Sequence, residues 1–194
     1  KRALAATFLA GAVTLTAGGT AHAENFFKML FQGSDNFRPQ ASGPGAAVPY
    51  KYQRQRVRYN TSEKPGTIVI HSDEKFLYLV EGNGKAMRYG VGVGREGFGW
   101  KGNVTIGRKA EWPGWTPPAS MRARERAKGR ILPAYMEGGP KNPLGARAMY
   151  LYRGGKDTIF RIHGTSEPWT IGHNVSSGCI RLVNADVSDL YSRV

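Results

Sequence analysis

The feature that most constrains the fold of this chain is a series of short β-rich runs separated by turns. An Asn-Gly pair at residues 83–84 and a Gly-Gly pair at residues 154–155 each separate two runs, which is typical of hairpins. Strands of this length and spacing predict a mainly β sandwich or barrel-like domain. The runs are rich in β-branched and aromatic residues and cover residues 67–70, 76–80, 86–93, 149–152 and 158–163.

Two short helical patches interrupt this pattern. Residues 120–128 are rich in Arg and Ala, and residues 185–191 place Val187 and Leu190 on one face behind Asn184, a candidate N-cap. Glycines 90, 92 and 94 have the spacing of a phosphate-binding loop, but no strong helix follows them. We therefore interpret these glycines as sites where two backbones approach closely.

Cysteine and histidine content limits how the domain can be held together. The chain has one cysteine, Cys179, and four scattered histidines, so an intrachain disulfide is excluded and no zinc-type ligand spacing exists. We expect neither a metal nor an organic cofactor. With 40% hydrophobic residues, the chain can be stabilised by an ordinary apolar core.

Residues 1–23 have the composition of a secretory signal peptide. Two basic residues precede an uncharged run that ends in the small-x-small pattern Ala21-His22-Ala23. Threonines and glycines dilute this run, whereas a membrane-spanning helix needs about 20 mostly apolar residues, so an uncleaved anchor is the lesser alternative. The prediction is an exported protein of the periplasm or cell wall, without a stable membrane span after cleavage.

The chain is strongly basic, with 28 Lys and Arg against 14 Asp and Glu and a net charge of +14. Such a balance can indicate nucleic-acid binding, but export makes an anionic cell envelope the better partner and nucleic acid an unexpected one. Residues 24–66 are predicted to be a linker or basic arm. Its basic run at residues 51–58 either binds an anionic polymer or is a solvated charge run.

Residues 67–194 form the predicted folded domain. Because no closing strand follows the last helical patch, we expect this domain to be truncated at its C-terminal end. The chain also begins without Met, which indicates that residues are missing before Lys1.

A histidine and the single cysteine form the candidate catalytic pair. His163 ends one β-rich run and Cys179 begins another sixteen residues later, so both can lie on neighbouring strands. A neighbouring imidazole is the common device for converting a thiol into a nucleophile. Taken singly, each residue has an ordinary explanation, because a lone Cys is usually a small buried hydrophobe and a lone His a satisfied core residue.

Residues next to this pair suggest the rest of a site. The backbone carbonyl of Gly164 can orient the imidazole, and Gly178 permits a turn with positive φ. Amides near Ser177, Gly178 and Cys179 can then converge on an oxyanion. Arg181 either supports the site or meets a substrate carboxylate, although alone it would be an ordinary ion pair.

These motifs together resemble the YkuD-type L,D-transpeptidases. The resemblance is carried by His163-Gly164, a spacer, and the segment from Ser176 to Leu182, and it extends through residues 112–118 and 138–145, which are similar to the family's lid. It covers roughly residues 67–194. Many relatives have a second His at the position of Ser177, so the role of that position is open. We expect His173, in the spacer, to be a surface or lid residue.

The resemblance implies a fold and a reaction. The fold is the family's β-sandwich with short helices, and the substrates are peptidoglycan stem peptides. Cys179 is the nucleophile, His163 the base and Gly164 the orienting carbonyl, while Gly178, Ser177 and Arg181 line the oxyanion and substrate region. Cys179 attacks the L-centre carbonyl of meso-diaminopimelate in a tetrapeptide stem and releases D-Ala, and the thioester then passes to an amine of a second stem or of an envelope protein.

The sequence leaves two alternative functions open. The same fold can carry a thiol L,D-carboxypeptidase or endopeptidase, in which water resolves the thioester. A non-catalytic wall-binding module that uses the basic arm is the second alternative, although the presence of His, Gly, Cys and Arg together argues against it.

Overall fold

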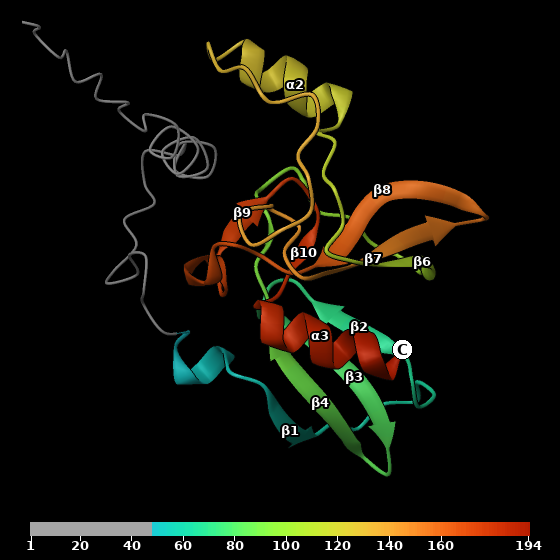
Figure 1. Cartoon of the computed structure of the whole chain (residues 1–194). Helices are drawn as coiled ribbons and strands as arrows, with labels where there is room; N and C mark the ends of the chain where they lie inside the picture. The colour runs from blue at the N-terminus through green and yellow to red at the C-terminus, as the bar shows by residue number, and fades with distance from the viewer. Residues whose placement is uncertain (1–47) are drawn as a thin grey trace, which may run out of the picture. The chain divides into compact units, whose positions relative to one another are not determined.

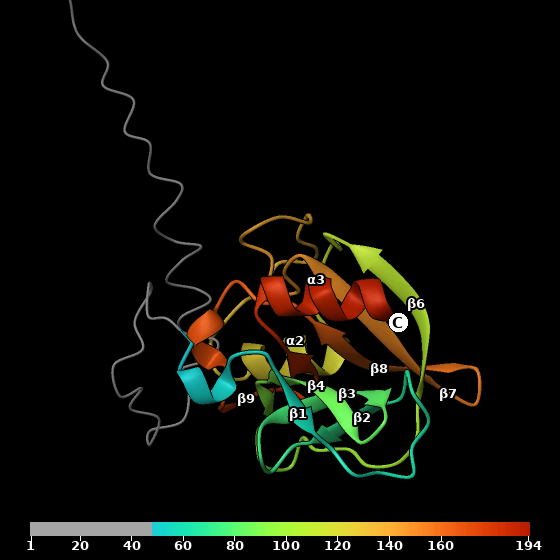
Figure 2. The ribbon, with the colours of Figure 1, turned by 90° about the horizontal axis from the view of Figure 1, so that it is seen from below.

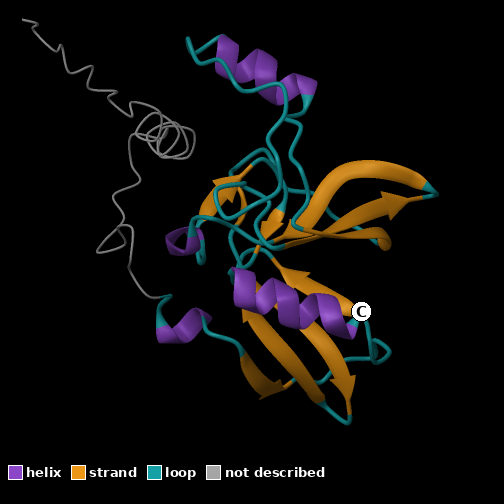
Figure 3. Ribbon diagram, in the orientation of Figure 1, coloured by secondary structure: helices purple, strands orange, loops and turns teal. Residues whose placement is uncertain are grey.

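The computed structural model describes residues 48–194. The predicted signal peptide, residues 1–23, and the part of the predicted linker before residue 48 lie outside this range. The described part is mainly β with short helices, as predicted (Figure 3). Its strands are β1 (Gln55–Arg58), β2 (Ile68–His71), β3 (Phe76–Gly82), β4 (Lys85–Gly90), β5 (Val93–Gly94), β6 (Thr105–Glu111), β7 (Arg147–Arg153), β8 (Lys156–His163), β9 (Asn174–Ser176) and β10 (Ile180–Arg181). Its helices are the 3-10 helices η1 (Tyr50–Tyr52) and η2 (Pro168–Thr170) and the α-helices α2 (Ala119–Arg126) and α3 (Asn184–Arg193).

Two four-stranded sheets form the frame of the domain. The first has the order β1-β4-β3-β2 and is antiparallel throughout, and the second has the order β10-β8-β7-β6. Within the second sheet, β10 pairs with β8 in parallel, while β6, β7 and β8 are antiparallel neighbours. Strands β5 and β9 form a small parallel pair, and α3 runs alongside both large sheets (Figures 1 and 2).

The sequence prediction of a hairpin at the Asn-Gly pair is confirmed. Strands β3 and β4 pair in antiparallel register on either side of it. Asn83 has φ +52° and Gly84 has φ +67°, which are the left-handed values that a two-residue hairpin turn requires.

The main core joins the two sheets to one face of α3. Burying one large apolar side chain in this core contributes about 1.5–3 kcal/mol to stability relative to leaving it exposed. The core therefore ties the strands that carry the candidate site to a continuous apolar layer. Its fully buried members include Leu77 and Tyr89 of the first sheet, Met149 and Leu151 of the second, and Val187 and Leu190 of α3.

Part of the predicted linker differs from expectation. Residues 55–58 form β1 and pair with β4, so this stretch belongs to the first sheet. Arg54 lies 2.8 Å from Asp189 on α3, and Arg56 lies 2.8 Å from Glu81 on β3. Alternating side chains of an edge strand can pair with acids on neighbouring elements, and this pairing accounts for two of the basic residues that the sequence assigned to an arm.

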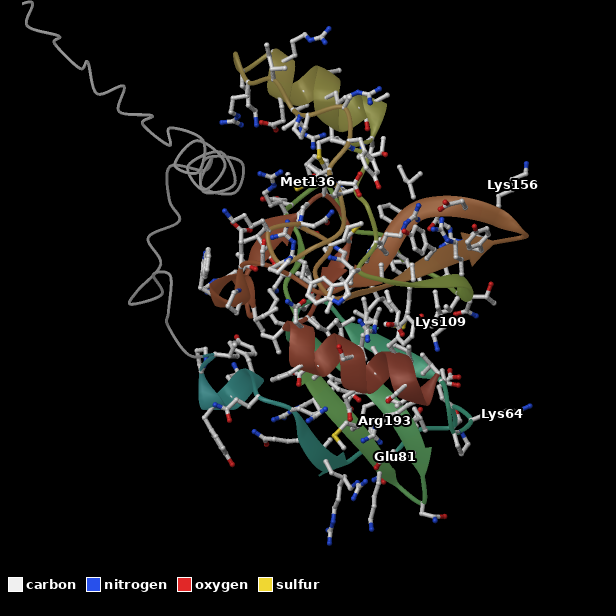
Figure 4. All side chains as sticks on the ribbon, viewed as in Figure 1. Lys64, Glu81, Lys109, Met136, Lys156 and Arg193 are labelled. Atoms are coloured by element: carbon white, nitrogen blue, oxygen red, sulfur yellow. The ribbon has the colours of Figure 1, made fainter. Side chains whose placement is uncertain are left out.

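The predicted cap of α3 is wrong. Val183 occupies the N-cap position without a side-chain hydrogen bond, and Asn184 is the first helical residue. The Asn184 Oδ1 instead accepts a hydrogen bond from the backbone N–H of Ala146, 2.9 Å away, which fixes the start of α3 against the loop before β7. At the other end of α3, Arg193 reaches Glu81 at 3.5 Å (Figure 4).

The glycines at positions 92 and 94 lie where two backbones meet, as predicted. A Cβ on Gly92 would lie 2.9 Å from the carbonyl oxygen of Thr170. A Cβ on Gly94 would lie 2.8 Å from the carbonyl oxygen of Phe98 and 3.2 Å from the Cα of Gly178. The segment around β5 can therefore pack directly against the turn that precedes Cys179.

Helix α2 projects from the body of the domain on two extended segments (Figure 1). Trp115 and Met136 join these segments through two backbone hydrogen bonds of 2.8 Å, and Met136 lies at the base of the projection (Figure 4). Asn142, which is 1% exposed, donates to the carbonyl oxygens of Met136 and Glu137. These contacts give the returning segment a defined path despite its lack of strands.

Candidate active site

Parallel pairing of β10 with β8 joins the segments that carry the candidate nucleophile and base. Ile180 lies opposite Ile162, and Arg181 lies opposite His163. The backbone N–H of Leu182 donates to the carbonyl oxygen of His163 at 2.9 Å. Cys179 directly precedes β10, so continuing the register places it opposite Arg161, two residues before His163 on β8.

The imidazole of His163 is held in one orientation. Its Nδ1 lies 2.6 Å from the carbonyl oxygen of Gly164, the contact that the sequence predicted. Because a carbonyl oxygen only accepts, Nδ1 carries the proton and Nε2 of the neutral ring keeps its lone pair. Burial, and then the charge of Arg181, lowers the pKa of His163 to about 3. The ring is therefore neutral at pH 7 and able to accept a proton.

Cys179 is a protonated thiol in the resting site. Burial raises its pKa, and this effect outweighs a backbone hydrogen bond from Arg161 and the charges of Arg161 and Arg181. Part of the Cys179 residue nevertheless remains accessible to solvent. With a neutral thiol and a neutral imidazole, the resting state is not a thiolate–imidazolium pair, so activation requires proton transfer during attack.

The turn before Cys179 is closed by Ser176, a member of the motif to which the sequence assigned no role of its own. The Ser176 hydroxyl donates to the carbonyl oxygen of Cys179 at 2.6 Å and accepts from the Gly178 N–H at 3.1 Å. Trp100 adds a hydrogen bond from Nε1 to the Gly178 carbonyl oxygen at 3.0 Å. The signal in the sequence was a serine two residues before a glycine, because serine hydroxyls commonly accept from the amide two positions on.

Gly178 occupies a conformation that suits glycine alone. Its φ is +105°, so the prediction of a positive-φ turn is confirmed. A Cβ there would lie 2.4 Å from Cε1 of Phe160 and 2.9 Å from the carbonyl oxygen of Phe98. The N–H of Gly178 is one of three that were expected to face an oxyanion, but it already donates a hydrogen bond to the hydroxyl of Ser176.

Arg181 lies inside the protein rather than at its surface. It is 4% exposed, and its Nη1 is 3.3 Å from Oε2 of Glu167, which is 5% exposed. Of the two roles left open by the sequence, this position favours support of the site over direct contact with substrate. Burial raises the pKa of Glu167 to about 7 against the opposing effect of Arg181. Sequence reasoning missed Glu167, whose only signal was that a buried arginine requires an acidic partner.

His173 directly precedes β9, and Ser177 directly follows it. The hydroxyl of Ser177 accepts a hydrogen bond from Nη2 of Arg124, 3.0 Å away. This bond links α2 to residues 176–179, the turn that carries the candidate nucleophile (the nucleophile turn). His173 is half-buried, and its carbonyl oxygen accepts from the backbone N–H of Val93 at 3.0 Å. Burial, with a smaller effect of Lys75, lowers the pKa of His173.

Metal-ion clusters and membrane-spanning helices are both absent from residues 48–194. No group of three or more His, Cys, Asp or Glu side chains in this range is arranged to hold a metal ion. None of the helices in the same range is long and apolar enough to cross a membrane.

Comparison with known proteins agrees with this geometry. Residues 65–194 match the family described as YkuD, L,D-transpeptidase catalytic domain. The probable L,D-transpeptidase YbiS of Escherichia coli K12 is 31% identical over 189 residues, covering 94% of this chain and 60% of YbiS. The probable L,D-transpeptidase ErfK/SrfK of the same organism is 34% identical over 164 residues, covering 84% of this chain and 49% of the relative. The chain thus spans about half to three fifths of the length of these curated relatives.

A solved structure is also similar to this chain. It is the crystal structure of a probable carnitine operon oxidoreductase, caia, from Brucella melitensis, with 53% sequence identity and a TM-score of 0.53. The match covers 74% of this chain and 89% of that one. The description of that structure concerns the neighbour, whereas the family match and both curated relatives agree on L,D-transpeptidase.

Proposed function

Because this chain belongs to the YkuD family of L,D-transpeptidase catalytic domains, which acts on peptidoglycan, we propose that it is a cysteine-dependent peptidoglycan L,D-transpeptidase. The observation that carries the proposal is the parallel pairing of β8 with β10, the strand that directly follows Cys179, together with the His163 Nδ1, which lies 2.6 Å from the Gly164 carbonyl oxygen. A nucleophile, a base and a group that orients the base are thereby held on rigid elements.

The first half of the proposed reaction forms a thioester. The acyl donor is a tetrapeptide stem, and the carbonyl attacked is that at the L-centre of meso-diaminopimelate. As the sulfur of Cys179 bonds to this carbon, Nε2 of His163 takes the thiol proton. The carbon–nitrogen bond to D-Ala then breaks, and His163 returns the proton to the departing amine. The raised thiol pKa and lowered imidazole pKa support this order, in which charge develops only during attack.

Oxyanion stabilisation falls in this proposal to the backbone around Cys179. The Gly178 amide already donates to Ser176, so we assign the oxyanion to the Cys179 N–H with help from neighbouring groups. The charge of Arg181, held beneath the site by Glu167, favours the negative charge that develops there. Arg181 is a positioning residue here, because it acts through the field it creates.

In the second half of the reaction, an amine attacks the thioester carbon, the carbon–sulfur bond breaks, and the amine proton passes through His163 to the departing sulfur of Cys179. The side-chain amine of a second stem gives a cross-link, and a lysine of an envelope protein gives an anchored protein. We propose that the protein works outside the cytoplasm, in the periplasm or cell wall, where these acceptors occur. Water as acceptor would give the L,D-carboxypeptidase reaction of the same thioester.

Product analysis tests the proposal. The wild-type protein and a Cys179→Ala variant are incubated with purified tetrapeptide stems, and the products are separated and weighed by mass spectrometry. We expect D-Ala and cross-linked dimers with the wild type and neither with Cys179→Ala. Tripeptide without dimers would show that the protein hydrolyses the stem instead of transferring it. Equal activity of Cys179→Ala would exclude Cys179 as the nucleophile.

A further inference from the structure

Two arginines from separate elements meet beside the nucleophile turn. Arg95 directly follows β5, and its backbone N–H donates to the Ser176 carbonyl oxygen at 3.0 Å. Arg124 comes from α2, and its Nη2 donates to the hydroxyl of Ser177 at 3.0 Å. The two guanidinium carbons lie 5.7 Å and 5.1 Å from the centre of the Phe98 ring. Residues far apart in the sequence thus bring two fixed positive charges to one place.

These two guanidinium groups are incompletely paired within the domain. In residues 48–194, the Nε atoms of Arg95 and Arg124 are buried without a hydrogen-bond partner. The hydrogen bond of Arg124 goes to a neutral hydroxyl, and its Nε is 3.7 Å from Glu125, beyond hydrogen-bond distance. Glu125 is held instead by two hydrogen bonds from Arg130. Guanidinium groups bind carboxylates through paired N–H donors, and these two have donors to spare.

Electrostatics favour an anion beside the two arginines. Burial, and then the charge of Arg124, lowers the pKa of Arg95, so each group experiences the other's repulsion. Lys128, 3.5 Å from Glu125, and Arg130 share that carboxylate with Arg124, which leaves the cluster with excess positive charge. A bound anion would remove this repulsion and satisfy the buried donors at the same time.

We propose that Arg95 and Arg124 form a carboxylate-binding subsite for the acyl donor, an inference that rests on the function proposed above. Ser177, which Arg124 contacts, is two residues from Cys179, so their Cα atoms are at most about 7 Å apart. A carboxylate bound by Arg124 therefore lies beside the turn that carries Cys179. The donor offers two such groups, the terminal carboxylate of D-Ala and the side-chain carboxylate of diaminopimelate.

Binding to a protein that cannot react provides the test. Isothermal titration calorimetry is carried out on Cys179→Ala with three synthetic tetrapeptides: the free acid, the D-Ala C-terminal amide, and the diaminopimelate side-chain amide. The same titrations are repeated with Arg124→Gln added, with Arg124→Lys added, and with Arg122→Gln added. Arg122 is an exposed residue of the same helix and serves as the matched control.

We expect Arg124→Gln to weaken binding of the free acid about tenfold or more, as for loss of a charged hydrogen bond. One of the two amides lacks the carboxylate that the arginines bind. That peptide should bind Cys179→Ala about as weakly as the free acid binds the protein with Arg124→Gln added, and adding Arg124→Gln should not weaken its binding further. That amide identifies which carboxylate is bound. Arg124→Lys should lie between the parent and Arg124→Gln, and Arg122→Gln should match the parent.

The inference is overturned if Arg124→Gln weakens all three peptides equally, weakens none, or has the same effect as Arg122→Gln. D-Ala release by the wild-type protein is measured separately. Release without any carboxylate-dependent effect of Arg124 would leave the proposed function standing and remove the subsite. A carboxylate-dependent effect without release would establish the subsite and remove the proposed function.

Discussion

Replacing Gly178 with Ala tests the geometry of the nucleophile turn. The backbone at Gly178 has φ +105°, well beyond the left-handed minimum near +57°, and the added Cβ would lie 2.4 Å from Cε1 of Phe160. The conformational cost for a residue with a Cβ is about 1–2 kcal/mol. Overpacking against the ring and the Phe98 carbonyl adds about 1–3 kcal/mol. We therefore expect Gly178→Ala to lower the free energy of unfolding by about 2–5 kcal/mol.

Gly154→Ala separates the two contributions. Gly154 also has a positive φ, +55°, but a Cβ there has nothing within 4 Å. This variant should lose only the conformational part, about 1–2 kcal/mol. Urea unfolding followed by circular dichroism measures both variants, and a slope of about 1–3 kcal/mol per M makes a difference of this size visible in the midpoint. Equal losses for Gly178→Ala and Gly154→Ala would refute the argument that the turn has no room for a side chain.

Replacing Ser176 with Ala removes two hydrogen bonds of about 0.5–1.5 kcal/mol each, so urea unfolding should show a loss of about 1–3 kcal/mol, and an unchanged midpoint would mean that the turn holds without it. Alkylation of Cys179 by iodoacetamide should be slow at pH 7 and accelerate above about pH 8.5, because burial raises the pKa of the thiol; a midpoint below the usual thiol range would contradict a protonated resting state. His163 should make the fold less stable by about 1.4 kcal/mol per unit as pH falls from 6.5 toward 3, because the unfolded chain binds a proton that the fold excludes. Glu167, whose pKa is raised to about 7, binds a proton in the folded state and so opposes this loss of stability between pH 7 and 4.5. Glu167→Gln removes the opposing effect, so urea titrations of this variant should give a lower free energy of unfolding at pH 5.0 than at pH 6.5. Equal free energies at the two pH values would contradict the effect of His163.

The local features of the site were the predictable ones. A glycine before the thiol, an Asn-Gly turn and a His-Gly pair each report on the backbone within a few residues. The positive φ of Gly178 and the contact of His163 with the Gly164 carbonyl oxygen therefore followed from sequence alone.

Contacts between distant segments were not predictable. Glu167 pairs with Arg181 across fourteen residues, and Arg124 on α2 reaches Ser177 across 53. Likewise, Arg54 finds its acidic partner on α3, far along the chain. A charge run has the same sequence pattern whether its partners are water or a remote helix, so β1 was missed.

The protonation states of the proposed catalytic pair, Cys179 and His163, could not be predicted from the sequence. The sequence indicated that a neighbouring imidazole could convert the thiol into a nucleophile, but it did not show how deeply either group is buried. Burial disfavours the charged form of both groups, so it raises the pKa of Cys179 and lowers that of His163. The depth of a residue depends on the whole packed core, which no single motif encodes.

Intact-protein mass spectrometry after incubation with a carbapenem tests most directly whether Cys179 is an acyl-accepting nucleophile. A carbapenem is an acylating agent that leaves a stable covalent adduct on such a thiol. The account predicts a mass increase of one carbapenem per wild-type chain, located on Cys179 by peptide mapping, and none for Cys179→Ala. An unmodified wild-type protein whose Cys179 still reacts with iodoacetamide would contradict it.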